Sequence, residues 1–452
     1  YYYGDTIPNF GGHKNSRFTV GPGYDYEIIN TEILLELTVK DNKLINTRTG
    51  AEFKMLVLAD EYGINSDVLL KLNNLAQQRA AITGSKPHKL NNHQNRNISE
   101  LEGIIDDLWQ DENSSNKRKR SIISDTKPAQ LLAEMNVVPD INYVDKDFHT
   151  IDYTHYAKDD VHFYFICNTT DGWVSRNIGF RQQNKGPELW DPETGSIVSI
   201  PVYQQEGDYI TMPITLAPYG STFIVFSEGN RIPVYKRIKA SGPFTPMIRY
   251  TGEGFYFLEE GTYNATGEKQ EVSFSDIKQV KNLDGPWEVF FPSRFGTPAK
   301  IIFPKLMSWT EHDDESIKYF SGIARYEKSF TFDGNTSLQG NQKYILDLGK
   351  FTNVGQVWIN DQPLGISWCE PHSFDISSFL RPGPNKLVVE IANTWSNRLV
   401  GDAVSGENYT STNITSTDVI NGFQIKAPWA EVPLIDSGLF GPVTITTTKV
   451  YK

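Results

Sequence analysis

Two segments of the chain place aromatic rings beside polar side chains, which is the combination that a sugar site needs. An aromatic ring stacks on the face of a sugar, and polar groups hydrogen-bond its hydroxyls. The first segment is the N-terminal loop, which opens with Tyr1–Tyr3 and continues through Asp5, Asn9, His13 and Arg17. Loops at strand ends often carry function, which favours a sugar site here. A solvent-exposed loop, in which Asn and Asp side chains cap the backbone, explains the segment about equally well.

The second segment, Asn393–Asp402, directly follows a predicted strand. In the functional interpretation, Trp395 is a stacking platform and Arg398 and Asp402 meet the ligand. In the structural interpretation, Trp395 is buried under an Arg398–Asp402 ion pair that fixes the loop. The structural one is favoured, because charged pairs on folded loops are usually structural. The candidate substrate-binding residues are therefore Asp5, Asn9, His13, Trp395, Arg398 and Asp402.

The sequence does not identify a catalytic pair. Glycoside hydrolysis needs two carboxylates on opposite sides of the sugar, one protonated and one charged. The chain has 55 Asp and Glu residues, but their separation in space cannot be read from the sequence. No glycine-rich phosphate loop, serine nucleophile elbow or His/Cys metal spacing occurs. The acidic segment Trp309–Glu315 could offer oxygen ligands to Ca²⁺, but a solvated loop is the favoured interpretation.

Charge and composition argue against several partners. The formal net charge is -12, and an acidic surface repels phosphate backbones, so no nucleic-acid partner is expected. No apolar run approaches the roughly 18 residues that cross a bilayer, so no membrane partner is expected. Cys167 and Cys369 lie in different predicted domains and are expected to be free thiols.

The front of the chain predicts an α/β fold. Met55–Ala59 is a short apolar run typical of a buried strand, and Ala80–Gly84 is the next one. Between them, Ser66 can cap a helix with a single apolar face, formed by Val68, Leu69, Leu72 and Leu75. This strand–helix–strand order predicts a parallel, flavodoxin-like α/β layer over residues 26–145.

The remainder is mostly β in pattern. Short strands with turns every 8–12 residues predict a small β-sandwich over residues 146–230. The basic, proline-containing segment 231–250 is expected to be a linker. Residues 251–452 predict a C-terminal jelly-roll (galactose-binding-like) sandwich without a helix of useful length. Asn360-Asp361 is expected to be a hairpin turn within it.

Several blocks of the second half resemble the sugar-binding sandwich of glycoside hydrolase family 2 and its relatives. They are Gly285–Val289, Tyr319–Tyr326, Leu346–Gly349, Val357–Asn360, Phe374–Ser377 and Ser437–Val443. The Asn-Thr-Trp-x-Asn-Arg-Leu-x-Gly-Asp variant at Asn393–Asp402 is similar to glycoside hydrolase family 106, the α-L-rhamnosidase type. The front half also resembles that family, at Tyr3–Asn9, Gly23–Tyr26, Thr83–Pro87 and Pro187–Gly195.

The resemblance to family 106 implies an inverting hydrolase that removes α-L-rhamnosyl units from polysaccharides with the assistance of Ca²⁺. It implies a carbohydrate ligand and a catalytic barrel upstream in the same protein, with residues 1–25 forming the barrel's end or an active-site loop. The acid and base glutamates would lie in that barrel, so this chain alone is expected to lack them. Because such enzymes are usually exported, a secreted or periplasmic location is expected.

Three alternatives remain open. One is a non-catalytic carbohydrate-binding module, which would bind without turnover. Another is a scaffold module with no ligand site. The last is a family 2-like β-glycosidase, which would share the terminal sandwich but not the front half.

Overall fold

The strands and helices of the chain group into two compact units. The first comprises Tyr1–Phe148, Ile178–Gln182 and Gly207–Tyr209, and the second comprises His149–Asn177, Gln183–Glu206 and Ile210–Lys452. The computed structural model describes residues 1–2, 4, 21–59, 63–91, 96–109, 122, 127–143, 150–229, 232–242, 244–267, 270–276, 278–293, 295–333, 341–412, 416–420 and 423–452.

The first unit is an α/β arrangement of short elements. Its helices are α2 (Thr31–Glu36), α3 (Ser66–Gln77), α4 (Ile98–Leu108) and α5 (Pro128–Glu134). Its strands are β1 (Leu37–Lys40), β2 (Lys43–Asn46), β3 (Glu52–Phe53), β4 (Leu56–Val57), β5 (Gly63–Asn65), β6 (Ile82–Thr83), β7 (Lys89–Asn91) and β8 (Ile141–Tyr143). Strands β1, β2 and β3 form an antiparallel sheet that the sequence did not predict.

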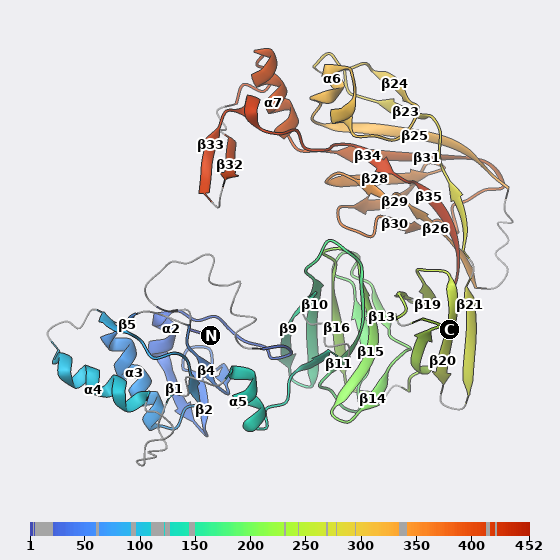
Figure 1. Cartoon of the computed structure of the whole chain (residues 1–452). Coiled ribbons are helices and arrows are strands. Elements are labelled where there is room, and N and C mark those ends of the chain that lie inside the picture. Colours follow the sequence, from blue (N-terminus) through green and yellow to red (C-terminus); the bar gives the residue numbers. More distant parts are fainter. Residues whose placement is uncertain are drawn as a thin grey trace. The chain divides into compact units, whose positions relative to one another are not determined.

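The predicted strand–helix–strand unit is confirmed. Strand β4 pairs in parallel with β6, and α3 lies between them in the sequence. The predicted apolar face of α3 is fully buried, and α3 lies beside α4 (Figure 1). Ser66 is not the cap, because Asn65 takes that position and the Ser66 hydroxyl instead accepts a 2.6 Å hydrogen bond from Arg96. The described strands make two short parallel ladders, β4–β6 and β5–β7, so a continuous flavodoxin-like sheet stays a prediction.

Residues 150–229 form two sheets, as a sandwich requires. Their strands are β9 (Ile151–Lys158), β10 (Val161–Asn168), β11 (Val174–Phe180), β12 (Gly186–Trp190), β13 (Ile197–Ser199), β14 (Gln204–Glu206), β15 (Tyr209–Leu216) and β16 (Ser221–Ser227). One sheet has the order β13-β12-β16-β10-β9, and the other contains β14, β15 and β11 in that order. Alternate residues of β10, such as Tyr164 and Ile166, are completely buried, which fits a strand with one face on a core.

The linker predicted over residues 231–250 contains strands instead. Strands β17 (Tyr235–Ala240), β20 (Gly261–Gly267) and β21 (Glu271–Asp276) form one sheet, and β18 (Ile248–Thr251) pairs with β19 (Gly254–Phe257). The basic residues of β17 suggested a linker, but they alternate with the buried Ile238. Aromatic rings pack this small module, with Phe257 stacked on Tyr263 at 3.6 Å between centroids.

The terminal part is a two-sheet β-sandwich. Strands β22 (Gln279–Asn282), β35 (Thr444–Lys449), β26 (Gln342–Asp347) and β30 (Ser373–Asp375) form one sheet in that order. The other sheet runs β24 (Lys300–Phe303), β23 (Trp287–Phe290), β25 (Ile323–Phe332), β31 (Gly383–Ala392), β28 (Val354–Ile359) and β29 (Gln362–Ser367). Residues of both sheets share one core, which includes the fully buried Trp287, Tyr326, Leu346 and Val389. The jelly-roll connection stays a prediction.

Shorter elements complete the terminal sandwich. They are η1 (Trp309–Glu311), α6 (Glu315–Lys318), β27 (Lys350–Phe351), α7 (Ser396–Ser405), β32 (Ser416–Ile420), β33 (Phe423–Ala427), η2 (Trp429–Glu431) and β34 (Leu439–Gly441). The expectation of no useful helix was wrong, because α7 has ten residues. The predicted Asn360-Asp361 turn is confirmed, and both residues have positive φ, which Asn and Asp tolerate well.

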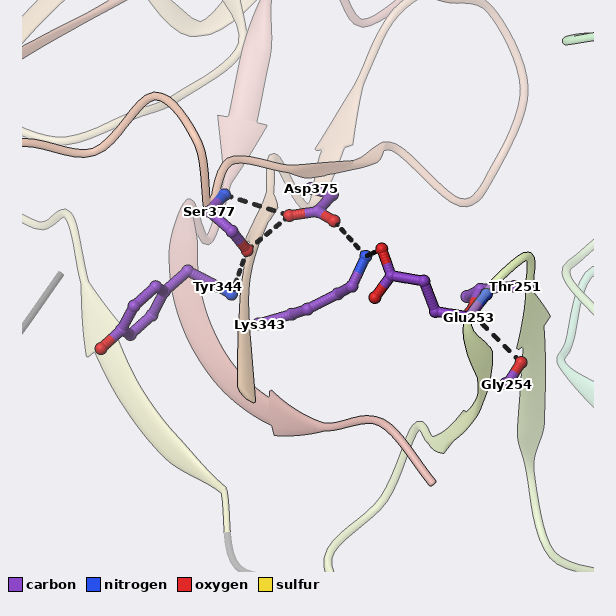
Figure 2. Close-up of polar contacts among 7 residues, drawn as sticks. All are labelled: Thr251, Glu253, Gly254, Lys343, Tyr344, Asp375 and Ser377. Carbon is purple, nitrogen blue, oxygen red and sulfur yellow. Dashed lines mark hydrogen bonds and ion pairs between the residues drawn. The ribbon is translucent and has the colours of Figure 1, made fainter. Parts of the chain in front are cut away.

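A lysine ties the β18–β19 hairpin to the terminal sandwich. The ammonium group of Lys343 lies 2.7 Å from Asp375 and 3.4 Å from Glu253, which follows β18 (Figure 2). The hydroxyl of Ser377 donates to Asp375 and accepts from the Tyr344 backbone amide, 2.9 Å away. Hydrogen bonds from Lys343 and Ser377 oppose the effect of burial and hold the pKa of Asp375 below its usual value.

Buried His372 makes the terminal sandwich sensitive to acid. Its Nδ1 shares a 2.7 Å hydrogen bond with the Ser367 hydroxyl, its ring centroid lies 3.9 Å from that of Phe351, and the residue is 8% exposed. Burial lowers its pKa from 6.5 to about 4. Between these two pH values, the unfolded chain binds a proton that the folded chain excludes, so the free energy of unfolding falls as the pH drops.

We expect His372 to cost the fold about 2 kcal/mol at pH 5 relative to pH 7.5. Urea unfolding of the wild type and of His372→Gln should show this as a difference that opens below pH 6.5, because glutamine does not titrate. Parallel pH profiles for the two proteins would show that His372 is not kept neutral.

Candidate functional site

The N-terminal half of the predicted site cannot be placed. Asp5, Asn9 and His13 lie outside the described residues, so their role in substrate binding stays a prediction.

The other half of the predicted site begins with two asparagines after β31. The Asn393 side chain accepts from the Gly322 amide at 2.9 Å and donates to the Phe320 carbonyl and the Ser437 hydroxyl, each at 3.0 Å. The Asn397 side chain exchanges two bonds with the Ile435 backbone, at 2.7 and 2.8 Å. Both amides thus hold distant loops together rather than facing a ligand.

Arg398 and Asp402 form a buried ion pair one turn apart on α7. Their side chains are 5% and 9% exposed, and Arg398 Nε donates to Asp402 Oδ1 at 2.8 Å. The other carboxylate oxygen of Asp402 accepts from the backbone amide and the hydroxyl of Thr410, at 3.0 and 2.7 Å. This geometry is the one that the structural interpretation of the sequence described: the ion pair fixes the loop that follows α7.

The guanidinium of Arg398 lies beside two aromatic rings that also contact each other. Its central carbon is 5.6 Å from the centroid of Phe295 and 5.1 Å from that of Tyr409. A cation held over ring faces in this way is attracted by the ring quadrupoles. The arginine therefore contacts both rings and helps to hold them in place.

Trp395 is not buried, contrary to the structural interpretation. It is 55% exposed and Tyr409 is 50% exposed, and both rings pack edge-on against Phe295. We call Phe295, Trp395 and Tyr409 the aromatic platform. Exposed rings on a rigid support can stack on the face of a sugar. Sequence reasoning missed Phe295 and Tyr409, and Phe295 is a hundred residues from Trp395, so no local pattern could link them.

A calcium site could use a cluster of metal-binding side chains. Among the described residues, no group of three or more His, Cys, Asp or Glu side chains could hold a metal ion. In the acidic segment Trp309–Glu315, the Asp314 carboxylate caps α6 by accepting from the Ser316 amide at 2.9 Å. A calcium ion, implied by the family resemblance, stays a prediction.

We expect Arg398→Met to destabilise the protein by about 3–5 kcal/mol, because it leaves the Asp402 carboxylate buried without its cation. Trp395→Ala removes a half-exposed ring and should cost under about 1 kcal/mol. Lys300→Met is the matched control, since it breaks an ion pair with Glu288 in which both side chains are 47% exposed. Urea unfolding measures all three, and equal costs for Arg398→Met and Lys300→Met would contradict the structural role of the buried pair.

Several known proteins are similar to this chain in sequence or in fold. Residues 1–205 match the family model described as α-L-rhamnosidase, glycoside hydrolase family 106. The solved structure of a rhamnosidase from Novosphingobium sp. PP1Y superposes with a TM-score of 0.65 and 25% identity, covering 99% of this chain and 38% of that one.

Two further proteins that are similar to this chain are named as β-glucuronidases. A curated protein of Formosa agariphila named "Putative beta-glucuronidase" is 23% identical over 94% of this chain and 53% of its own length. A β-glucuronidase from Ruminococcus gnavus, solved with D-glucuronic acid, matches 38% of this chain and 30% of its own, with 24% identity and a TM-score of 0.27. That score is too low to establish a shared fold.

The chain thus spans about half the length of its curated relative and 38% of the solved rhamnosidase. It has no helix, in the part that the structure describes, long and apolar enough to cross a membrane. In sequence over residues 1–205, and in fold over nearly its whole length, the chain is similar to the α-L-rhamnosidases of glycoside hydrolase family 106.

Proposed function

We propose that this chain is the C-terminal portion of a glycoside hydrolase that removes α-L-rhamnosyl units from polysaccharides. The observation that carries the proposal is that a family model and a solved structure both match this chain to rhamnosidases. The α-L-rhamnosidase family model covers residues 1–205, and the rhamnosidase structure covers 99% of the chain.

We propose that the catalytic carboxylates lie outside the described residues. A glycosidase acid needs a pKa raised into the working pH range beside a second carboxylate that stays ionised. The described carboxylates noted above serve structural roles instead: Asp375 binds Lys343, Asp402 binds Arg398 and Asp314 caps a helix. The acid and base would come from a catalytic barrel that precedes this chain, as in the family that it resembles.

The chain would contribute carbohydrate contacts and support to that barrel. On the aromatic platform, Trp395 and Tyr409 offer exposed ring faces, and Arg398 and Asp402 act by positioning them. Asp5, Asn9 and His13 are proposed to contact the sugar from the loop near the barrel. Because polysaccharides lie outside the cell, we propose that the protein is exported.

A β-glycosidase is the second candidate. It is favoured by the Formosa agariphila relative, whose printed name is a β-glucuronidase and which matches 94% of this chain. An α-L-rhamnoside and a β-D-glucuronide differ in charge, because only the glucuronide carries a carboxylate. The two functions are therefore separable by substrate.

The test compares two aryl glycosides, p-nitrophenyl α-L-rhamnopyranoside and p-nitrophenyl β-D-glucuronide, with the full-length protein from its native source. We expect kcat/KM for the rhamnoside to exceed that for the glucuronide by roughly 100-fold or more, because a site shaped for one sugar leaves polar groups unpaired with the other.

The control is the 452-residue chain alone, which should hydrolyse neither glycoside. Release of nitrophenol from the glucuronide only would favour the β-glycosidase. Inertness of the full-length protein toward every α-L-rhamnoside would contradict the proposed function.

A further inference from the structure

A cavity of the second unit shares no lining residue with the aromatic platform. It has a volume of about 630 Å³, within the range of about 300–1,000 Å³ that is usual for small-molecule sites. Its lining includes Trp173, Asp191, Glu193 and Tyr219 from the small sandwich, Arg249 from β18, and Trp368 to Pro371 after β29. We call this cavity the aromatic groove.

We propose that the aromatic groove is a carbohydrate-binding site, separate from the catalytic centre, that holds a neutral oligosaccharide segment. The proposal rests on the proposed function in one respect: the saccharide would belong to the polysaccharide that the enzyme degrades.

Three exposed aromatic rings line the groove from three separate loops. Trp173, Tyr219 and Trp368 are 40%, 69% and 62% exposed. Exposed rings of this size leave apolar area in contact with water, and their gathering around one cavity marks a binding site. The C–H face of a pyranose covers such a ring while its hydroxyls stay at the edge, where polar groups can reach them.

Acidic residues also line the same cavity. One oxygen of Asp191 accepts from the Glu193 backbone amide at 2.8 Å, which fixes its side chain in the turn after β12. One oxygen of Glu193 accepts from the Cys369 thiol at 3.0 Å. Burial and the carboxylate of Glu193 raise the pKa of Cys369 to about 12, so this thiol is a neutral donor. Each carboxylate has a second oxygen that can accept a hydrogen bond from a sugar hydroxyl.

The charge of the lining selects against anions. Asp191, Glu193 and Glu370 carry three formal negative charges and Arg249 carries one positive charge, which leaves -2 in the groove. A polyuronate or a sulfated polysaccharide would be repelled there, whereas a neutral saccharide would not.

Polar contacts fix the small sandwich, β18 and the segment after β29, which together line the groove. Besides the Cys369–Glu193 bond, Arg249 donates to the Ser373 hydroxyl at 3.3 Å. Lys343 joins Glu253 to Asp375 just beyond the groove (Figure 2). On the other side, the Tyr250 hydroxyl donates to the Pro213 carbonyl at 3.0 Å. A site fixed in this way loses little conformational freedom on binding, which favours affinity.

The proposal is tested by isothermal titration calorimetry on the full chain with two probes, α-L-rhamnotriose and an oligogalacturonide of equal length. We expect binding of the rhamnotriose to weaken at least about tenfold in Trp368→Ala and in Trp173→Ala, since each removes one stacking face. Glu193→Gln keeps the groove's shape and should change rhamnotriose binding less, while improving binding of the anionic probe.

Tyr156→Ala is the matched control, because Tyr156 is 63% exposed on the small sandwich and does not line the groove. It should bind rhamnotriose as the wild type does. Unchanged rhamnotriose affinity in folded Trp368→Ala and Trp173→Ala would overturn the proposed site. Equal wild-type affinity for the two probes would overturn its preference for neutral sugars. Loss of rhamnotriose binding in Trp368→Ala, together with an enzyme inert on α-L-rhamnosides, would uphold the groove and refute only the proposed function.

Discussion

The polar side chains that follow β31, half-buried Asn393 and buried Asn397, must find partners, and this requirement organises one end of the terminal sandwich. A buried amide without a hydrogen bond costs about 1–3 kcal/mol. Asn393 and Asn397 both donate to the Ser437 hydroxyl, at 3.0 Å each, and so join the start of α7 to the segment before β34. Beside them, Gly438 has a φ of 111°, and a Cβ there would come within 2.6 Å of Trp309. Glycine therefore lets the chain pass close to the buried Trp309–Tyr326 hydrogen bond.

The same network explains why the polar motif Asn393–Asp402 resembles a binding site, although its asparagines, Arg398 and Asp402 are bonded within the fold. Its asparagines and its ion pair are used within the fold, and the Arg398 guanidinium supports Phe295 and Tyr409. The ring that the motif exposes is that of Trp395. Two surfaces of the second unit, the aromatic platform and the aromatic groove, expose aromatic rings that we propose to be carbohydrate contacts. At both, carboxylates and cations hold the surrounding loops in place.

The sequence predicted those elements whose pattern is local. The apolar face of α3 and the Asn360-Asp361 turn follow from helical periodicity and from the tolerance of Asn and Asp for positive φ. Helix α7 was not predicted because its buried face includes the polar residues Asn397, Arg398 and Asp402. The helix therefore lacks the apolar 3.6-residue periodicity that predicts a helix. Strand β17 escaped because basic residues cover its exposed face. The groove could not be predicted, since Trp173, Glu193 and Trp368 meet only through tertiary contacts.

We propose that aromatic ring faces, and not the buried Arg398–Asp402 pair, recognise carbohydrate in this chain. The most direct measurement is a crystal structure of the chain soaked with α-L-rhamnotriose. We expect a sugar ring stacked on Trp368 in the aromatic groove. The Arg398–Asp402 and Asp402–Thr410 bonds should stay unchanged. Sugar hydroxyls bonded to Arg398 or Asp402, with Thr410 displaced, would contradict this proposal.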